Sequence, residues 1–514
     1  MASQSLRPEG LPARSLADVV VAVGGHLVGE RDAPITGVSL DTSEIRPGDL
    51  FVAVKGSSRH GVEFLDEAKA RGAVAVLTDP AGRERAREGT LPVAVHDAPR
   101  TVVGECARLI YDPGMALPRV LAVTGTNGKT STAFFMAHIV EKMGTVSALS
   151  TTAERRIAGQ SYYTRLTTPE APELQAFLSL SAQRGVRVVS LEASAQAIER
   201  HRLGGMRVAV AGFTNLSHDH LEDYGDMDTY LLAKAALFRP ELSDRGVVSL
   251  DSPWGEDLRR RASIPVVTLQ DEEVNLGQAS PEWTFRTTGV EDDRTLFTLR
   301  GPSGELSSSI PGMGQHMVHN AALAVAMVVE SGEDWEKITQ AIDVRHGGID
   351  FVVPGRLEKV SGDSRLSIYV DAGRSEDAYR RTLQTLRQRT QGALIMVCGT
   401  SGNRDESKRP LMGEAAATYA DRVIITDDDP RFEDPARIRS ALLGGARSVP
   451  GATVEEVPNP TDAIRRAVES ARPGDVIVWS GPGSQSYREI RGERVPFSAR
   501  DEATLALREA GWLS

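Results

Sequence analysis

The stretch Thr124-Gly125-Thr126-Asn127-Gly128-Lys129-Thr130 decides the fold of this chain, because it connects an apolar segment to a helical one. The apolar residues 119–123 predict a buried strand, and residues 130–143 predict a helix. A glycine-rich turn at such a junction lets backbone N–H groups and the helix N-terminus face phosphate oxygens. Lys129 offers a cation and Thr130 a magnesium ligand. The stretch therefore predicts a phosphate-binding loop.

The loop departs from the full Walker A pattern, since Val123 stands where that pattern has glycine. The alternative interpretation is an ordinary glycine turn whose lysine is merely solvated. The strand predicted before the loop and the helix predicted after it favour phosphate binding over that alternative.

Outward from the loop, the chain divides into three α/β blocks, at residues 1–117, 118–352 and 353–514. Apolar segments alternate with helical ones in each block, which is typical of sheets covered by helices. Pro-Gly pairs at 113–114 and 354–355 interrupt the pattern near the two boundaries. The predicted strands are residues 50–54, 74–78, 119–123, 188–191, 208–212, 394–398, 422–426 and 476–480. We expect a central parallel sheet and a second, Rossmann-like sheet in the third block.

Composition excludes several classes of protein. The chain has 514 residues, of which 40% are hydrophobic and 25% charged, as in a globular enzyme of several domains. A net charge of −11 argues against nucleic-acid binding. The two cysteines, Cys106 and Cys398, have no metal-type spacing and give no disulfide framework. Without a signal peptide or an apolar span, the chain is expected to be cytoplasmic and monomeric, with no membrane partner.

Several ordered segments, beginning with Gly-Thr-Asn-Gly-Lys-Thr at 125–130, resemble the Mur ligase family over nearly the whole chain. The resemblance is strongest to its UDP-N-acetylmuramoyl-tripeptide synthetase (MurE) branch. It implies three domains that bind, in order, a UDP-linked acceptor, ATP and an amino acid. It also implies an ATP- and Mg²⁺-dependent ligase of peptidoglycan synthesis, which joins a carboxylate to an amine through an acyl phosphate. The other matching segments are Asp-Leu-Phe-Val-Ala at 49–53, Thr-Thr-Pro-Glu-Ala at 167–171, Phe-Thr-Asn-Leu-Ser at 213–217 and Lys-Arg-Pro-Leu-Met-Gly at 408–413.

The candidate catalytic residues are Lys129, Glu192, His220 and Lys234. By resemblance, Glu192 and His220 hold one magnesium ion and Thr130 serves another. On the residues alone, a single Glu and a single His are more often structural. Lys234 lies in an apolar helical stretch, and the matching lysine of the family is carbamylated, which turns a cation into a metal-binding anion. The alternative for Lys234 is a lysine whose stem is buried and whose head reaches water.

The resemblance also assigns the ATP contacts. Gly125, Thr126, Asn127, Gly128, Lys129, Thr130 and Ser131 form the phosphate loop. Asn320 is expected near adenine, Arg356 at the phosphates and Asp371 at the ribose hydroxyls. Met317 replaces the asparagine that is usual in the family, so the adenine contacts are expected to differ.

The acceptor contacts implied by the family are partly retained. Thr151, Thr152, Thr167, Thr168, Ser194 and Arg202 match positions that touch the UDP-muramoyl peptide. Ala195 and Gln196 replace the serine and histidine of the family's Ser-Ser-His segment.

The amino-acid pocket departs further from the family. Arg404 and Arg431 match the arginines that grip the carboxylate of the incoming amino acid, but Asp429 stands where asparagine is usual. The family segment Gly-Lys-Gly-His-Glu is Gly-Pro-Gly-Ser-Gln at 481–485, so Gln485 cannot supply the charge of the final glutamate. Tyr-Ala-His-Thr-Pro is replaced by Ala-Gly-Arg-Ser-Glu at 372–376. We expect diaminopimelate and lysine to be poor substrates.

These observations favour a MurE-like amino-acid ligase. One alternative is a divergent relative that ligates a carboxylate or amine outside peptidoglycan synthesis, which the changes at 372–376 and 481–485 would suit. A more distant alternative is a non-catalytic nucleotide-binding subunit. Retention of Lys129, Glu192 and Lys234 argues against it, because a pure binder needs no second metal site.

Overall fold

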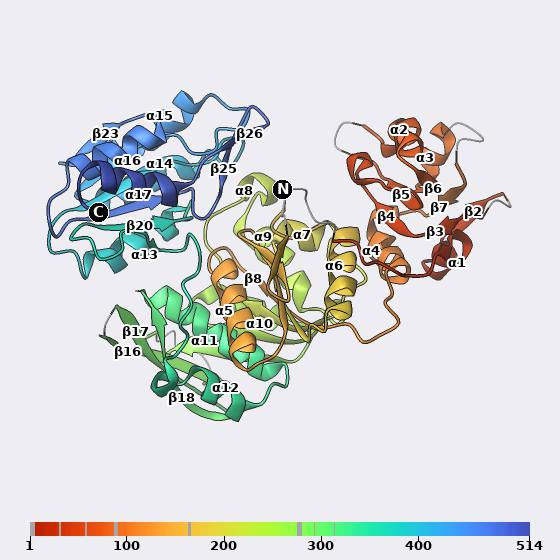
Figure 1. The fold of residues 1–514 in the computed structure, drawn as a ribbon, viewed down its shortest axis with the longest axis horizontal. Helices are drawn as coiled ribbons and strands as arrows, with labels where there is room; N and C mark the ends of the chain where they lie inside the picture. The colour runs from red at the N-terminus through yellow and green to blue at the C-terminus, as the bar shows by residue number, and fades with distance from the viewer. Residues whose placement is uncertain are drawn as a thin grey trace.

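Three large β-sheets follow one another along the chain in the computed structural model, which describes residues 6–29, 32–56, 59–86, 91–162, 166–274, 280–291, 293–312 and 314–513. Figure 1 shows the N-terminal sheet in red at one end, the central sheet in the middle and the C-terminal sheet in blue at the other end. Each sheet has helices against it, which confirms the predicted α/β class. The domain boundaries at 117/118 and 352/353 stay a prediction.

The N-terminal sheet has five strands in the order β2-β7-β6-β5-β4. Its middle strands β5 and β6 are mostly apolar and are buried except for the half-buried Val74, as expected of a sheet covered on both faces. Helix α4 joins this lobe to the next one by packing against α6 of the central lobe (Figure 1). The elements are α1 (Leu16–Ala22), β2 (His26–Val28), β4 (Gly37–Ser39), β5 (Asp49–Ala53), α2 (Leu65–Ala70), β6 (Ala73–Thr78), α3 (Pro80–Arg85), β7 (Val93–Val95) and α4 (Pro99–Ile110).

The central sheet has eleven strands in the order β11-β10-β9-β12-β8-β13-β14-β15-β16-β17-β18. Strands β9 to β16 in this order are parallel, and antiparallel strands extend the sheet at both ends. The strands are β8 (Arg119–Thr124), β9 (Ser147–Ser150), β10 (Arg155–Ile157), β11 (Gln160–Tyr162), β12 (Val188–Glu192), β13 (Val208–Phe213), β14 (Ser243–Ser249), β15 (Val266–Asp271), β16 (Trp283–Glu291), β17 (Arg294–Gly301) and β18 (Gly304–Pro311).

Two apolar cores lie on the two faces of the central sheet. Helices α5, α11 and α12 cover one face, and α6, α7, α9 and α10 cover the other. The helices are α5 (Lys129–Lys142), α6 (Ala171–Gln183), α7 (Ala195–Glu199), α8 (Leu221–Tyr224), α9 (Met227–Ala235), α10 (Pro253–Arg261), α11 (Gln315–Glu330) and α12 (Trp335–Ile342). Between these two helix layers, the carboxyl ends of β8, β12 and β13 lie beside one another. Sheets of this α/β kind bind their ligands at such strand ends.

The C-terminal sheet has six strands in the order β19-β20-β24-β21-β22-β23, parallel from β20 to β23. Its elements are β19 (Glu358–Lys359), β20 (Ser367–Asp371), α13 (Glu376–Arg387), β21 (Leu394–Cys398), α14 (Lys408–Tyr419), β22 (Arg422–Ile425), α15 (Pro435–Arg447), β23 (Val454–Glu456), α16 (Pro460–Glu469), β24 (Val476–Ser480), β25 (Tyr487–Ile490), β26 (Glu493–Pro496) and α17 (Ala499–Glu509). Helices α13 to α15 cover one face, and α16 and α17 the other.

The predicted strands and the loop helix are found within one or two residues of their expected bounds. Before β6, a 3₁₀ turn, Gly61–Phe64, leads directly into the short helix α2. The antiparallel extension β16–β18 was not predicted, because its strands alternate weakly between buried and exposed residues.

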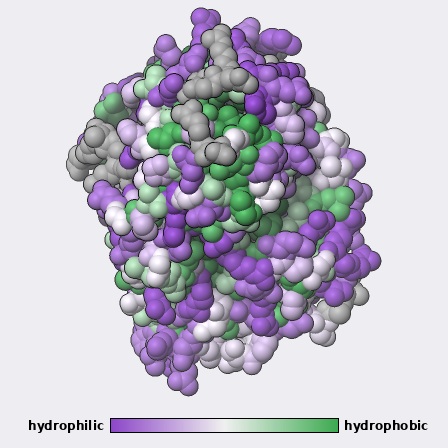
Figure 2. Space-filling model, turned by 90° about the vertical axis from the view of Figure 1, so that its right-hand side faces the viewer, coloured by the Kyte–Doolittle hydropathy of each residue, from purple (hydrophilic) through white to green (hydrophobic). Residues whose placement is uncertain are grey.

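The end of the molecule seen in Figure 2 is mostly hydrophilic, with apolar patches between polar side chains. This matches a composition in which a quarter of the residues are charged, 25%. Within the described ranges, no helix combines the length and the apolar character needed to cross a bilayer.

Candidate active site

The turn between β8 and α5 has glycine at two positions where another residue would not fit. Gly125 and Gly128 have φ angles of 148° and 90°, which L-residues rarely adopt. A Cβ atom on Gly125 would collide with the Thr214 hydroxyl, and one on Gly128 with the Asn320 amide. Helix α5 begins at Lys129 without a side-chain cap, so its first N–H groups can bind an anion.

Two lysines converge on this turn. Lys129 Nζ donates to the carbonyl oxygens of Gly125 (3.0 Å) and Thr126 (2.8 Å). Lys234 Nζ, from α9, donates to the Gly125 oxygen at 2.9 Å and lies 4.0 Å from the centre of the Tyr230 ring. Burial lowers the pKa of Lys129, and burial together with the charge of Lys129 holds the pKa of Lys234 well below its usual value. Two buried amines thus share one carbonyl oxygen of the loop.

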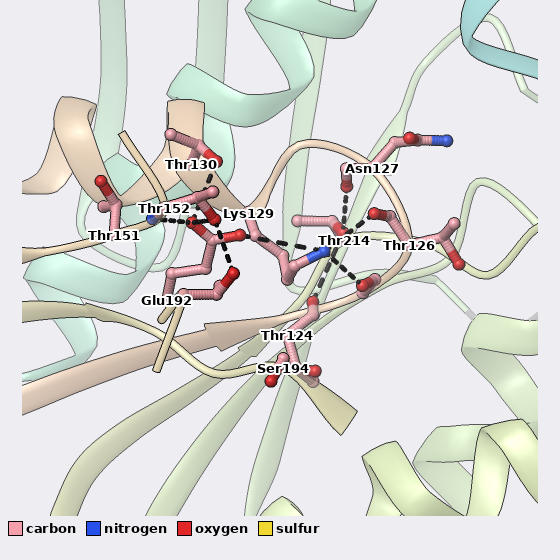
Figure 3. A network of polar contacts seen from close by, with 12 residues as sticks. Thr124, Thr126, Asn127, Lys129, Thr130, Thr151, Thr152, Glu192, Ser194 and Thr214 are labelled. Atoms are coloured by element: carbon pink, nitrogen blue, oxygen red, sulfur yellow. Dashed lines mark hydrogen bonds and ion pairs between the residues drawn. The ribbon is translucent and has the colours of Figure 1, made fainter. Parts of the chain in front are cut away.

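Glu192, the last residue of β12, connects the loop to the next strand end (Figure 3). Its Oε2 accepts from Thr130 Oγ1 at 3.0 Å, from Thr152 N at 3.0 Å and from Thr152 Oγ1 at 3.1 Å. Its Oε1 lies 4.0 Å from Lys129 Nζ. Thr152 Oγ1 also bonds Thr167 Oγ1 at 3.0 Å. One buried carboxylate thus contacts the expected phosphate side and the expected acceptor side.

The expected metal ligand His220 has a left-handed backbone, with φ of 57°, just before α8. Its Nε2 lies 3.7 Å from Asp219 Oδ2 and its Nδ1 lies 3.7 Å from Glu222 Oε1. Burial lowers the pKa of His220, which favours the neutral, ligating form. Nδ1 is buried and makes no hydrogen bond among the described residues. His220, Glu222 and Asp223 place ligand atoms within 4.8 Å of one another.

Contacts from the C-terminal lobe reach this centre. Arg356 Nη2 donates to Thr130 Oγ1 at 2.9 Å, and burial lowers its pKa. Lys408 Nζ donates to Asp219 Oδ1 at 2.8 Å, with only 9% of the lysine side chain exposed. Sequence reasoning missed Asp219 and Lys408. The available signal was that Lys408 opens the matching segment at 408–413 and that Asp219 lies two residues after the one at 213–217.

The expected nucleotide contacts Asn320 and Asp371 are both buried. The Asn320 amide lies against the phosphate turn, and its Nδ2 lies 3.9 Å from Met317 Sδ. Asp371 Oδ1 accepts from Leu357 N at 3.0 Å and Oδ2 from Gly373 N at 2.8 Å. Both carboxylate oxygens of Asp371 thus already accept backbone hydrogen bonds. The hydroxyl groups of a ribose would have to donate to the second lone pairs of these oxygens.

Most of the expected acceptor residues surround Glu192. Thr168 Oγ1 donates to the Glu192 carbonyl oxygen at 2.8 Å and accepts from Ser194 N at 3.1 Å. Arg202 Nη1 donates to Thr168 O at 3.2 Å. Arg202 Nε also lies 2.9 Å from Glu170 Oε1, so this arginine is already paired. Glu170 is a third residue that sequence reasoning missed, although it belongs to the matching segment at 167–171.

Two of the residues expected to contact the acceptor substrate use their side chains in hydrogen bonds to residues close by in the sequence. Thr151 Oγ1 donates to Glu154 O at 3.0 Å. Ser194 Oγ caps α7 by accepting from Ala197 N at 3.2 Å. Thr151 follows β9 and Ser194 follows β12, the neighbouring strand that ends at Glu192 (Figure 3).

Two candidate donor-binding arginines lie near each other in the C-terminal lobe. Arg431 has a φ of 54°, and its Nε lies 3.6 Å from Glu489 Oε2. Burial lowers the pKa of Arg431, and the neighbouring charge of Arg404 lowers it further. Such a pair of repelling guanidinium groups is a ready site for a carboxylate.

Asp429 and Gln485 belong to the same pocket, and both contact a residue that sequence reasoning treated only as a lost histidine. Arg374 Nη2 lies 3.3 Å from Asp429 Oδ2 and donates to Gln485 Oε1 at 3.0 Å. Arg374 also lies close enough to Arg356 to lower its pKa, so the pocket adjoins the phosphate loop.

Three family profiles match consecutive parts of the chain. The "Mur ligase family, catalytic domain" profile matches residues 34–111, the "Mur ligase middle domain" profile 123–328 and the "Mur ligase, glutamate ligase domain" profile 355–483. The UDP-N-acetylmuramyl-tripeptide synthetase of Leifsonia xyli subsp. xyli is 46% identical, over 100% of this chain and 99% of that protein. The UDP-N-acetylmuramoyl-L-alanyl-D-glutamate–2,6-diaminopimelate ligase of Streptomyces avermitilis is 38% identical, over 98% and 97%.

Solved structures agree with this grouping. A UDP-N-acetylmuramoyl-L-alanyl-D-glutamate–2,6-diaminopimelate ligase superposes with a TM-score of 0.63 at 28% identity, over 93% of this chain and 95% of that one. The MurF ligase of Thermotoga maritima, solved with ADP, has a TM-score of 0.63 at 17% identity, over 92% and 97%, and supports the fold alone.

The chain therefore belongs to the Mur ligase family. Within it, the chain is a MurE-like ligase of peptidoglycan synthesis that forms an amide bond with the use of ATP, as predicted from the sequence. The predicted three-lobed Mur ligase architecture is confirmed. The two alternative functions find no support in these similarities. The roles of individual site residues stay predictions.

Proposed function

We propose that the protein joins an amino acid to the side-chain carboxylate of the D-glutamate in UDP-MurNAc-L-Ala-D-Glu. The observation that supports this best is the position of Glu192, which hydrogen-bonds both Thr130 of the phosphate loop and Thr152 of the acceptor rim. A phosphoryl donor at the loop and a carboxylate at the rim would meet there. Proximity of two bound reactants supplies a large part of an enzyme's rate enhancement.

The reaction proceeds in two steps. The acceptor carboxylate attacks the γ-phosphorus of ATP, the bond to ADP breaks, and an acyl phosphate forms. The neutral amine of the donor then attacks the acyl carbon, loses a proton, and the tetrahedral intermediate collapses to an amide and inorganic phosphate. Lys129 and Arg356, on two sides of Thr130, stabilise the charge of the transferring phosphoryl group. The steps require no covalent enzyme nucleophile.

Magnesium fits part of the candidate ligand set. The Thr130 hydroxyl and the Glu192 carboxylate are oxygen ligands, and the buried Nδ1 of His220 has a free ligating position among the described residues. Lys234 fits only if its amine carries a carboxylate, because an ammonium group repels a cation. Bound there, Mg²⁺ would neutralise phosphate charge and polarise the γ-phosphoryl group.

We assign the remaining site residues to three ligands: ATP, the UDP-linked acceptor and the donor amino acid. The loop residues 125–131, Asn320, Arg356 and Asp371 bind ATP, and the rim around Glu192 binds the acceptor. Arg404 and Arg431 bind the carboxylate of the donor amino acid. Use of ATP suits the cytoplasmic location predicted from the sequence, and light scattering would test the expected monomer.

The test is release of phosphate and formation of the peptide product, measured with UDP-MurNAc-L-Ala-D-Glu, ATP and a panel of amino acids. We expect product with at least one amino acid and none without ATP. Acceptors without the uridine nucleotide serve as the comparison. Turnover of such acceptors in preference to UDP-MurNAc-L-Ala-D-Glu would contradict the proposal and favour a ligase of other carboxylates.

A further inference from the structure

Arg374 makes three polar contacts in the part of the proposed donor pocket that would receive the side chain of the amino acid. Its Nε lies 2.7 Å from Asp428 Oδ2, and its Nη2 lies 3.3 Å from Asp429 Oδ2 and 3.0 Å from Gln485 Oε1. The two carboxylates are buried, with 4% and 6% of their side chains exposed, whereas 26% of the Arg374 side chain is exposed. The guanidinium group is therefore more exposed than either of the two acids that it pairs with.

These contacts remove the free negative charge that a distal ammonium group would need. Burial and the nearby Asp428 raise the pKa of Asp429, which shows that this acid depends on a cation for its ionised form. Its other oxygen, Oδ1, accepts from Glu489 N at 3.1 Å. Asp428 is thus already paired with Arg374, and Asp429 with Arg374 and a backbone N–H group.

The side chain of Gln485 indicates which kinds of donor group this pocket can bind. Its Oε1 accepts from Arg374, so its NH₂ group points to the opposite side. This position matches a glutamate in the family, where the acid receives the amino end of the donor. An amide here can donate to a hydroxyl or carbonyl oxygen, but it cannot compensate an ammonium charge next to a guanidinium.

We propose that Arg374 is a specificity-determining residue, a built-in cation that takes the place of the distal ammonium of a diamino acid. The pocket then accepts an L-amino acid whose side chain ends in an uncharged hydrogen-bonding group, a hydroxyl or an amide. It rejects lysine and diaminopimelate because Arg374 repels a second cation and already pairs with Asp428 and Asp429. This inference rests on the proposed function.

The test compares kcat/KM for L-serine, L-homoserine, L-asparagine and L-glutamine with kcat/KM for L-lysine and meso-diaminopimelate. We expect the wild-type protein to favour a hydroxyl or amide donor at least tenfold. The double variant Arg374→His with Gln485→Glu should shift the ratio toward the diamino acids at least tenfold, through the KM of the donor. Gln485→Glu alone should shift it less, because Arg374 would pair with the new acid.

Controls separate charge from structure. Arg374→Lys keeps the cation and should keep the preference for uncharged donors. Arg387→Ala, at the last residue of α13, the helix that follows Arg374, replaces an arginine that pairs with Asp421 at the surface and should leave the ratio unchanged. Melting temperatures of all variants identify a folding defect, in which case Gln485→Glu and Arg374→Lys still decide the matter.

Two failures can be told apart, because calorimetric binding of free amino acids requires no acceptor. Tighter binding of lysine than of every uncharged donor by the wild-type protein would overturn the role of Arg374, as would an unchanged ratio in the double variant. Selective binding of an uncharged donor without ligation to UDP-MurNAc-L-Ala-D-Glu would instead overturn the proposed acceptor and support Arg374.

Discussion

Lys129 and Lys234, from two different helices, donate hydrogen bonds to the same carbonyl oxygen of Gly125, at 3.0 and 2.9 Å. Two buried ammonium groups on one acceptor repel each other, which lowers the pKa of Lys234 beyond the effect of burial. The pair brings two amines to the phosphate loop. It also makes Lys234 the member that gains most from becoming neutral or anionic.

We predict that Lys129→Ala abolishes ATP-dependent turnover with little change in stability. Removing a charge that stabilises the transferring phosphoryl group typically reduces kcat by about 10²–10³-fold. Phosphate release with the best amino acid and thermal melting measure the two effects. Lys142→Ala is the matched control, since Lys142 lies at the other end of α5 and pairs with Asp350. Near-normal phosphate release by Lys129→Ala would refute the assignment of the ATP site.

A second prediction is that Lys234 becomes carbamylated in bicarbonate. The neutral amine attacks CO₂, an N–C bond forms and a proton leaves, so a lowered pKa favours the reaction at neutral pH. We expect the added mass in intact-protein mass spectrometry, its loss when acid protonates the amine, and partial rescue of Lys234→Ala by short carboxylic acids. An unmodified lysine in a high-resolution map together with failed rescue would count against it.

The third prediction concerns the donor carboxylate. Arg404→Ala and Arg431→Ala should each raise the KM of the amino acid at least tenfold, because a charged hydrogen bond contributes about 1.5–3 kcal/mol. The KM of ATP should change much less. Arg437→Ala, on the exposed side of α15, is the comparison. Equal effects on the KM values of ATP and amino acid would place these arginines outside the donor pocket.

A fourth prediction concerns the support of that pocket. The buried Arg409 donates from Nη1 to Glu433 Oε1 at 2.6 Å and from Nη2 to Oε2 at 2.8 Å, while Glu433 also accepts from Asn403 N. Glu433→Gln leaves a buried arginine without its anion and should destabilise the fold by about 3–5 kcal/mol. Glu414→Gln, exposed on α14, should change stability by less than about 0.5 kcal/mol.

The Arg409–Glu433 pair makes the stability of the fold depend on pH, and the direction of this dependence follows from the pKa shift of Glu433. The hydrogen bonds from Arg409 lower the pKa of Glu433 below its usual value of 4.5. Its contribution to stability is therefore complete above that value and is lost as the pH falls through the lower, folded-state pKa. Denaturant titrations of the wild type and Glu433→Gln should converge in acid. A constant difference down to pH 3, about one and a half units below the usual value, would exclude this linkage.

The sequence by itself determined the parts that depend on local pattern. The loop at 124–130 required glycine at 125 and 128, and the positive φ angles there give the physical reason. The apolar strands around it were predicted because a parallel strand buried on both faces leaves a continuous hydrophobic run. Ordered motifs were sufficient to identify the ligase family.

Only the tertiary structure decided which of these residues meet. Arg374 looked like the loss of a histidine, yet the fold sets it between Asp428, Asp429 and Gln485, from two other strand ends. Lys408 likewise reaches Asp219 from a separate lobe. Such contacts join residues far apart in the chain, and their strength depends on burial and on mutual charge. The local periodicity of the sequence contains neither the burial nor the mutual charge of these groups. The contacts behind the proposed specificity of the pocket can therefore be found only in the tertiary structure.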